Sequence, residues 1–135
     1  MPTSTLVAPV IPAINDAEIE RILEAVAETG VRHAGYVLLR LPLELRELFR
    51  EWLTEHFPDR VSHVFKLIRD MRGGKDNVST FGRRMTGSGP VAWMIGRRFE
   101  VACERLGFNL TSFKTTTAHF KPPRPCSQQL NLFAC

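Results

Sequence analysis

The chain has 135 residues, 44% of them apolar and 24% charged, a composition typical of one globular domain with a core of moderate size. It holds no apolar run approaching the roughly 18 residues that a membrane-spanning helix needs. It also opens without a basic region followed by an apolar segment. These features argue against an integral membrane protein and predict a cytoplasmic protein without a membrane partner.

Charge is distributed unevenly along the chain, whose net charge is +4. Residues 1–68 hold seven Lys and Arg against ten Asp and Glu, whereas residues 69–124 hold eleven against four. The basic second half favours a partner that carries phosphate, such as a nucleic acid. An ordinary solvated surface is the alternative interpretation of these charges.

The segment 7–42 is expected to form a strand, a helix and a second strand. Residues 7–12 are short and apolar, and residues 36–39 are continuously apolar, a pattern typical of parallel strands covered on both faces. Between them, apolar residues recur at helical spacing over residues 16–29. Because such connections nearly always have one hand, the segment predicts a right-handed βαβ unit.

Both ends of this predicted helix carry sequence signals. Asn15, followed three residues later by Glu18, has the spacing of a capping box, in which the two side chains bond to free backbone N–H groups. Ile14 and Ile19 have the spacing of a hydrophobic staple. Gly30 suits the left-handed residue that commonly ends a helix.

The rest of the chain is predicted to be mainly helical, which gives an α/β fold that is rich in helix and has two parallel strands or a minor third. Residues 43–71 are expected to form a helical hairpin and residues 72–89 a basic, glycine-rich loop. A further helix is expected over residues 90–107, followed by an extended C-terminal tail, 108–135. Residues 1–135 are thus predicted to form a single domain.

Histidines and cysteines give no recognisable catalytic or metal site. The four histidines are scattered, and the three cysteines have wide spacings that match neither a disulfide framework nor a zinc pattern. The sequence therefore predicts no metal site on this chain, and Cys103 is interpreted as a small buried residue. The residues considered are His33, His56, His63, His119, Cys103, Cys126 and Cys135.

The loop 72–89 is the first candidate for a binding surface. Its opening, Arg72-Gly73-Gly74-Lys75, follows a predicted helix and lacks the Gly-Lys-Ser/Thr ending of a nucleotide P-loop, so that function is rejected. Glycines let a backbone approach a phosphate closely, and an aromatic ring offers a platform for an unstacked base. A surface connection whose charges aid solubility is the alternative. The predicted nucleic-acid-binding residues are Arg72, Lys75, Phe81, Arg83 and Arg84.

The chain also resembles a known family. It is similar to the late strands of a radical S-adenosylmethionine (SAM) barrel, and more closely to the C-terminal part of the radical SAM proteins grouped with spore photoproduct lyase, the DNA repair photolyase-like group. The resemblance covers nearly the whole chain. It is carried by residues 7–19 and 36–42, Leu48-Phe49, Trp52-Leu53, Phe57-Pro58-Asp59-Arg60, Ile68-Arg69, Arg72-Gly73-Gly74-Lys75 and Gln128-Gln129-Leu130-Asn131-Leu132-Phe133.

This resemblance implies a partial (β/α) barrel in which residues 7–42 supply two late strands. Ligands of parallel barrels lie at the carboxyl ends of the strands. The corresponding late strand of radical SAM enzymes contacts SAM, usually through a glycine-containing motif, for which this chain has Pro12-Ala13. The positions that the resemblance places on the SAM side are Val10, Ile11, Pro12, Ala13 and Arg40.

Radical SAM chemistry also needs a [4Fe–4S] cluster held by three thiolates. The family's cluster motif, C-x-x-x-C-x-x-C, precedes the region of resemblance and is absent from this chain. The chain is therefore expected to bind no cofactor alone and to be a truncated or separately encoded half whose partner is the N-terminal half of the barrel.

In the intact parent, the resemblance implies cleavage of SAM at the cluster, with repair or modification of nucleic acid as its purpose. The competing interpretation is a nonenzymatic module that binds nucleic acid or an acidic partner through its basic half.

Overall fold

The computed structural model describes residues 3–75, 83–112 and 116–122. Its elements confirm the α/β class, the strand–helix–strand unit, the helical hairpin and the long final helix. None of the helices in these ranges is both long enough and apolar enough to cross a bilayer. In chain order the elements are β1 (Ser4–Val10), the short 3₁₀ helix η1 (Asp16–Glu18), α1 (Ile19–Glu28), β2 (His33–Leu38), α2 (Leu45–His56), the 3₁₀ helix η2 (Pro58–Arg60), α3 (Val61–Asp70), α4 (Arg83–Thr86) and α5 (Gly89–Leu106).

Strands β1 and β2 pair in parallel, and they are the strands of the one sheet found in the described ranges. Their register is regular up to Val7 opposite Tyr36 and resumes with Val10 opposite Leu38, so β1 uses one more residue than β2 between these pairs. The irregularity includes Pro9, whose nitrogen carries no hydrogen to donate to a ladder. The extra residue keeps both valines in the core.

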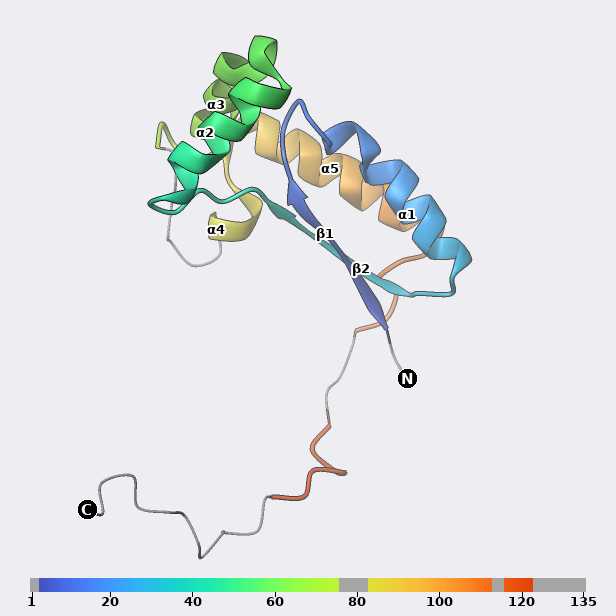
Figure 1. The fold of residues 1–135 in the computed structure, drawn as a ribbon. Coiled ribbons are helices and arrows are strands. Elements are labelled where there is room, and N and C mark those ends of the chain that lie inside the picture. Colours follow the sequence, from blue (N-terminus) through green and yellow to red (C-terminus); the bar gives the residue numbers. More distant parts are fainter. Residues whose placement is uncertain (1–2, 76–82, 113–115, 123–135) are drawn as a thin grey trace, which may run out of the picture.

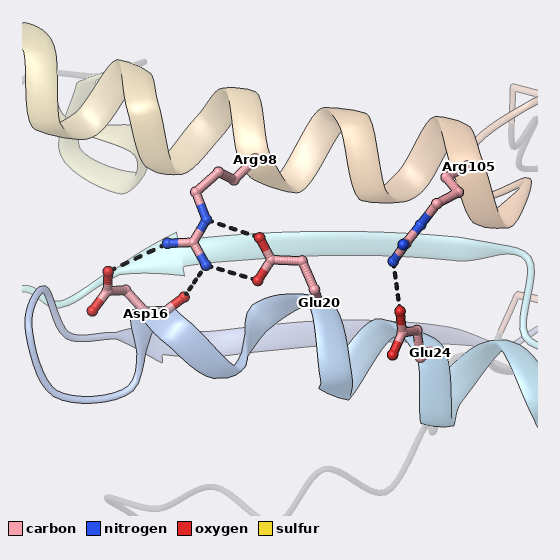
Figure 2. A network of polar contacts seen from close by, with 5 residues as sticks. All are labelled: Asp16, Glu20, Glu24, Arg98 and Arg105. Atoms are coloured by element: carbon pink, nitrogen blue, oxygen red, sulfur yellow. Dashed lines mark hydrogen bonds and ion pairs between the residues drawn. The ribbon is translucent and has the colours of Figure 1, made fainter.

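Helices α1 and α5 cover one face of this sheet and lie side by side, as Figures 1 and 2 show. On β1, Val7 and Val10 are buried, whereas Leu6 is 62% exposed and Ala8 is also exposed. The prediction that the strands are covered on both faces is therefore wrong for β1, because the described helices supply a layer on one side only.

The core lies between the sheet and these two helices and continues under the hairpin of α2 and α3. The buried residues of α5 recur three and four positions apart, which is the spacing of one helical face. Gly30 and Gly107 follow α1 and α5 with φ of 82° and 75°, as predicted for residues that end helices. Side chains with no exposed surface include Ile19, Leu23, Leu38, Leu53, Val64, Ile68 and Ile95.

The predicted capping box does not form. The side-chain oxygen of Asn15 accepts a hydrogen bond from the backbone N–H of Ile11 at 2.7 Å, and its side-chain nitrogen donates to the carbonyl of Pro9 at 3.0 Å. Neither η1 nor α1 has a side-chain cap. Asn15 closes the turn after β1 instead, because a short amide competes well for nearby backbone groups.

A side chain occupies part of the β2 edge where a third strand would pair. The amide of Asn109 accepts from the N–H of Ala34 at 3.0 Å and donates to the carbonyl of the same residue at 2.9 Å. The backbone N–H of Asn109 donates to the carbonyl of Arg32 at 2.9 Å. With φ of 58°, Asn109 adopts the left-handed conformation that asparagine tolerates better than most residues.

Two ion pairs join α1 to α5, and Figure 2 shows them bridging the helices in front of the strands. Arg98 donates Nε and Nη2 to the two carboxylate oxygens of Glu20 at 2.8 and 2.7 Å, and Nη2 also donates to the carbonyl of Asp16 at 3.0 Å. Arg105 meets Glu24 at 2.6 Å. Hydrogen bonding to Arg98 lowers the pKa of Glu20 and, reciprocally, raises the pKa of Arg98.

This pairing predicts a pH-dependent contribution to stability. Because the pKa of Glu20 is lower in the folded state, the stabilisation is fully present above the unfolded pKa and is lost as the pH falls through the folded pKa. The two side chains are 32% and 33% exposed, so Glu20→Gln should cost only about 0.5–1 kcal/mol near neutral pH. Urea unfolding over a pH series should show the difference vanish in acid, whereas Glu28→Gln should differ little from wild type throughout. A constant Glu20→Gln deficit at every pH would contradict this account.

Helix α5 comes close to β2 at Gly96. A Cβ atom at this position would lie 2.8 Å from the hydroxyl oxygen of Tyr36 and 3.8 Å from the ring carbon that carries the hydroxyl. The Tyr36 ring also packs against Phe99, with centroids 4.8 Å apart. The missing side chain is therefore what lets the ring lie beneath the helix.

Gly96→Ala should destabilise the chain by about 1–3 kcal/mol, because the added methyl group has no room beside the hydroxyl oxygen. In a Tyr36→Phe background that oxygen is gone, and alanine should then gain up to about 1 kcal/mol from its better helix propensity. A double-mutant cycle by denaturant unfolding measures both effects. The same sign and size of the Gly96→Ala effect in both backgrounds would refute the close contact.

Candidate functional site at the carboxyl edge of the sheet

The carboxyl ends of β1 and β2 meet at one edge of the sheet, and β2 leaves this edge toward α2 (Figure 1). The backbone N–H of Leu39 donates to the carbonyl of Val10 at 2.9 Å, so the segment after β1 begins beside the segment after β2. Ligands of parallel α/β sheets bind at this kind of edge. The structure thus brings residues 10–13 and Arg40, predicted separately from two stretches of sequence, to one edge.

Burial divides positions 10–13, at the end of β1, into two kinds. Val10 is 1% exposed and Pro12 is fully buried, so their side chains belong to the interior. Ile11 and Ala13 are half-buried. These two side chains and the loop backbone are therefore the groups that remain to meet a ligand.

The loop after β1 is held from two directions. Asn15 bonds to the backbone on the inner side of the turn, as described above. Arg60, at the end of η2, donates Nη1 to the carbonyl of Ala13 at 2.8 Å. Ala13 itself has φ of 61°, a left-handed conformation that costs free energy for a residue with a Cβ atom. The bonds from Asn15 and Arg60 therefore hold the loop in a conformation that includes one unfavourable backbone angle.

Arg72 lies inside the protein at the same edge, with 3% of its surface exposed. Its Nη2 donates to the carbonyl of Leu39 at 3.0 Å, and its Nη1 donates to the carbonyl of Arg84 at 2.8 Å. Burial lowers the pKa of Arg72, and the charge of Arg40 lowers it further. The predicted role of Arg72 in binding nucleic acid does not fit this placement, because its guanidinium is turned inward onto backbone carbonyls.

Arg40 is half-buried just beyond β2. Its Nε atom is buried and has no hydrogen-bond partner among the described residues. Such a donor is costly to leave unsatisfied. This position, predicted to face the ligand side of a barrel, thus carries unused hydrogen-bonding capacity.

The other residues predicted to bind nucleic acid are described only in part. Lys75 is exposed after α3, and Arg84 is half-buried in α4. Phe81 lies outside the described residues, and only the backbone of Arg83 is described. A nucleic-acid surface on the loop 72–89 therefore stays a prediction.

No group of three or more histidine, cysteine and acidic side chains suited to a metal is found within the described ranges. Cys103 is buried in α5, as predicted, and burial raises the pKa of its thiol. His33 lies on β2, whereas His56 and His63 lie on the exposed sides of α2 and α3.

Two hollows along α5 were not anticipated from the sequence. One, of about 430 Å³, lies among Tyr36, Trp93 and the glycine-rich turn before α5, and another, of about 340 Å³, lies over Met94 and Val101. Periodicity predicts Met94 on the buried face, but it is 46% exposed, and Trp93 is 72% exposed. The sequence signal for these hollows was Trp93, a large apolar residue that lies outside the buried face of α5. No predicted site residue lines either hollow.

Comparison of the chain with protein-family models, with curated proteins and with solved structures finds no match in any of the three. The candidate site is therefore interpreted from the residues of this chain.

The burial of Arg72 predicts a large effect of its replacement. Arg72→Met should cost about 2–4 kcal/mol, because it leaves the carbonyls of Leu39 and Arg84 without this donor inside the protein. Arg72→Lys should cost less, since one ammonium keeps the charge but cannot span both carbonyls. Denaturant unfolding measures the losses, and Lys66→Met on the exposed side of α3 is the matched control. A loss from Arg72→Met no larger than that of the control would show that these hydrogen bonds contribute nothing.

Proposed function

We propose that this chain is the C-terminal part of a radical SAM protein of the spore photoproduct lyase-like group, and that β1 and β2 are late strands of a (β/α) barrel completed by an N-terminal part. The observation that carries the proposal is the one-sided parallel sheet. Its helices lie on one face, and its other face and carboxyl edge are where a barrel would hold its interior and its ligand.

The open face of the sheet has the character of a barrel interior. In a (β/α) barrel the helices form an outer ring, and side chains from all the strands fill the inside. Here the Leu6 side chain lies over Gly35, with a carbon 3.2 Å from where a Cβ atom of that glycine would be, yet Leu6 remains 62% exposed. An exposed apolar face on a short parallel sheet is what removal of neighbouring strands would leave.

The β1–α1 loop also supports the resemblance. Ala13 adopts φ of 61°, which glycine adopts without steric cost. Radical SAM proteins usually carry a glycine-containing form of this motif. This chain departs from that form with Pro12-Ala13, and Ala13 adopts a backbone conformation that a glycine would adopt at lower cost.

The resemblance implies two cofactors, a [4Fe–4S] cluster and SAM, and the residues of this chain suit only SAM. An iron–sulfur cluster does not fit, because Cys103 is buried in α5 and the described residues offer no set of three ligands. SAM, which supplies a carbon radical in these enzymes, would be held partly by the backbone of residues 11–13, and Arg40 would face the same site. The contribution that we propose for this chain is therefore to supply two strands of the barrel and to help position SAM and substrate, with the cluster held by the N-terminal part.

The proposal predicts a two-part enzyme. An open reading frame upstream that bears C-x-x-x-C-x-x-C would supply the partner. After anaerobic reconstitution with iron and sulfide, this chain alone should retain no cluster. The co-produced pair should co-purify, retain a cluster and, with dithionite as the electron donor, cleave SAM reductively to methionine and 5′-deoxyadenosine.

Substitutions on the open face of the sheet test the proposed contact with the N-terminal part directly. Leu6→Asp should abolish co-purification without unfolding the chain, because Leu6 is already exposed, whereas Leu110→Asp, at a residue 78% exposed beyond α5, should have no effect. Stoichiometric iron on this chain alone after desalting, or equal co-purification of the Leu6→Asp and Leu110→Asp variants, would count against the proposal.

A further inference from the structure

Three arginines from three parts of the chain bring positive charge to the carboxyl edge of the sheet. Arg40 follows β2, Arg60 ends η2 and Arg72 follows α3. The guanidinium of Arg60 bonds to the loop after β1, and that of Arg72 bonds to the backbone at the end of β2. Arg40 is near enough for its charge to lower the pKa of Arg72, which is also lowered, and more strongly, by burial.

The hydrogen bonding of these arginines is unequal. Arg72 directs both terminal nitrogens at backbone carbonyls. For Arg40 and Arg72 alike, no acceptor of the buried Nε is found in the described part of the chain, so the two side chains differ in their terminal nitrogens, which only Arg72 directs at carbonyls there. Buried donors in folded proteins are nearly always satisfied by protein, water or ligand. A half-buried guanidinium whose terminal nitrogens are not engaged in the described part of the chain, beside a second positive charge, suits an oxyanion.

We infer that the carboxyl edge holds a subsite for a phosphate group, with Arg40 donating hydrogen bonds to it and Arg72 adding positive potential from below. A phosphate suits the subsite better than a carboxylate, because it can balance two like charges and offers more acceptor oxygens. A phosphodiester of nucleic acid and a phosphate monoester share this chemistry. The inference deepens the proposed function by naming the charged group of the substrate, and it rests on that function only for the suggestion of nucleic acid.

Equilibrium dialysis of the full chain against labelled inorganic phosphate, at an ionic strength held constant with potassium chloride, tests the subsite. Saturable binding is expected in wild type. Arg40→Met should weaken it by about tenfold or more, the usual effect of losing a charged hydrogen bond. Arg40→Lys should fall between the two. Arg21→Met removes the same charge from an exposed position on α1 and should leave the affinity unchanged.

A spectroscopic measurement locates the bound phosphate. In chain that contains isotope-labelled arginine, the Nε–H resonance of Arg40 is the one lost in Arg40→Lys. It should shift saturably with phosphate and stay in place with chloride.

A second set of ligands distinguishes the source of the phosphate. Tighter binding of a dinucleoside monophosphate than of inorganic phosphate supports the subsite as one for nucleic acid, whereas the reverse order supports it as one for a phosphate monoester. Equal affinity of folded wild type and folded Arg40→Met for both ligands overturns the inference, and so does acetate binding as tight as phosphate binding. None of these measurements uses a cluster, SAM or a second polypeptide, so their failure is separate from failure of the proposed function.

Discussion

The parallel pairing of β1 with β2 constrains everything else in this chain. Parallel neighbours cannot be joined by a tight turn, so the chain must return along the sheet, and α1 is that return. Because α1 alone cannot cover two strands, α5 lies beside it, and the Arg98–Glu20 and Arg105–Glu24 pairs hold the two helices together. Gly96 then lets α5 settle onto Tyr36. One face of the sheet is completed in this way, and the other stays open.

The carboxyl edge is built from side chains that bond to backbone rather than to one another. Asn15 and Arg60 fix the loop after β1, and Arg72 fixes the end of β2 to α4. Each polar group therefore immobilises a segment of chain around a place where ligands of parallel sheets bind. Arg40 differs from these residues, since no bond from its guanidinium to the backbone is found among the described residues, whereas Arg72 bonds through both terminal nitrogens. A rigid edge with one uncommitted cation is an arrangement suited to binding an anion rather than to proton transfer.

Two structural observations support the role that we propose for this chain. An open apolar sheet face suits a missing neighbour, and an ordered carboxyl edge suits a ligand that several strands share. The alternative, a basic loop that binds nucleic acid unaided, loses Arg72 to the interior. The function proposed for this chain is therefore completion of a site rather than catalysis alone. In this proposal its charged contribution lies at the strand edge, where Arg40 would meet the ligand.

Local periodicity and turn signals determined helices α1, α2, α3 and α5, because the helix stripes, Gly30 and Gly107 depend on neighbours in sequence. They missed the short helix α4 (Arg83–Thr86), which lies inside the segment 72–89 predicted as a loop. The same signals placed Ile11, Ala13 and Arg40 near strand ends. Only the tertiary structure decided which charges face inward, since burial of Arg72 depends on carbonyls of β2 more than thirty residues away in sequence. It likewise diverted Asn15 from capping and left one face of β1 open, because side-chain partners and sheet coverage are set by packing between distant segments.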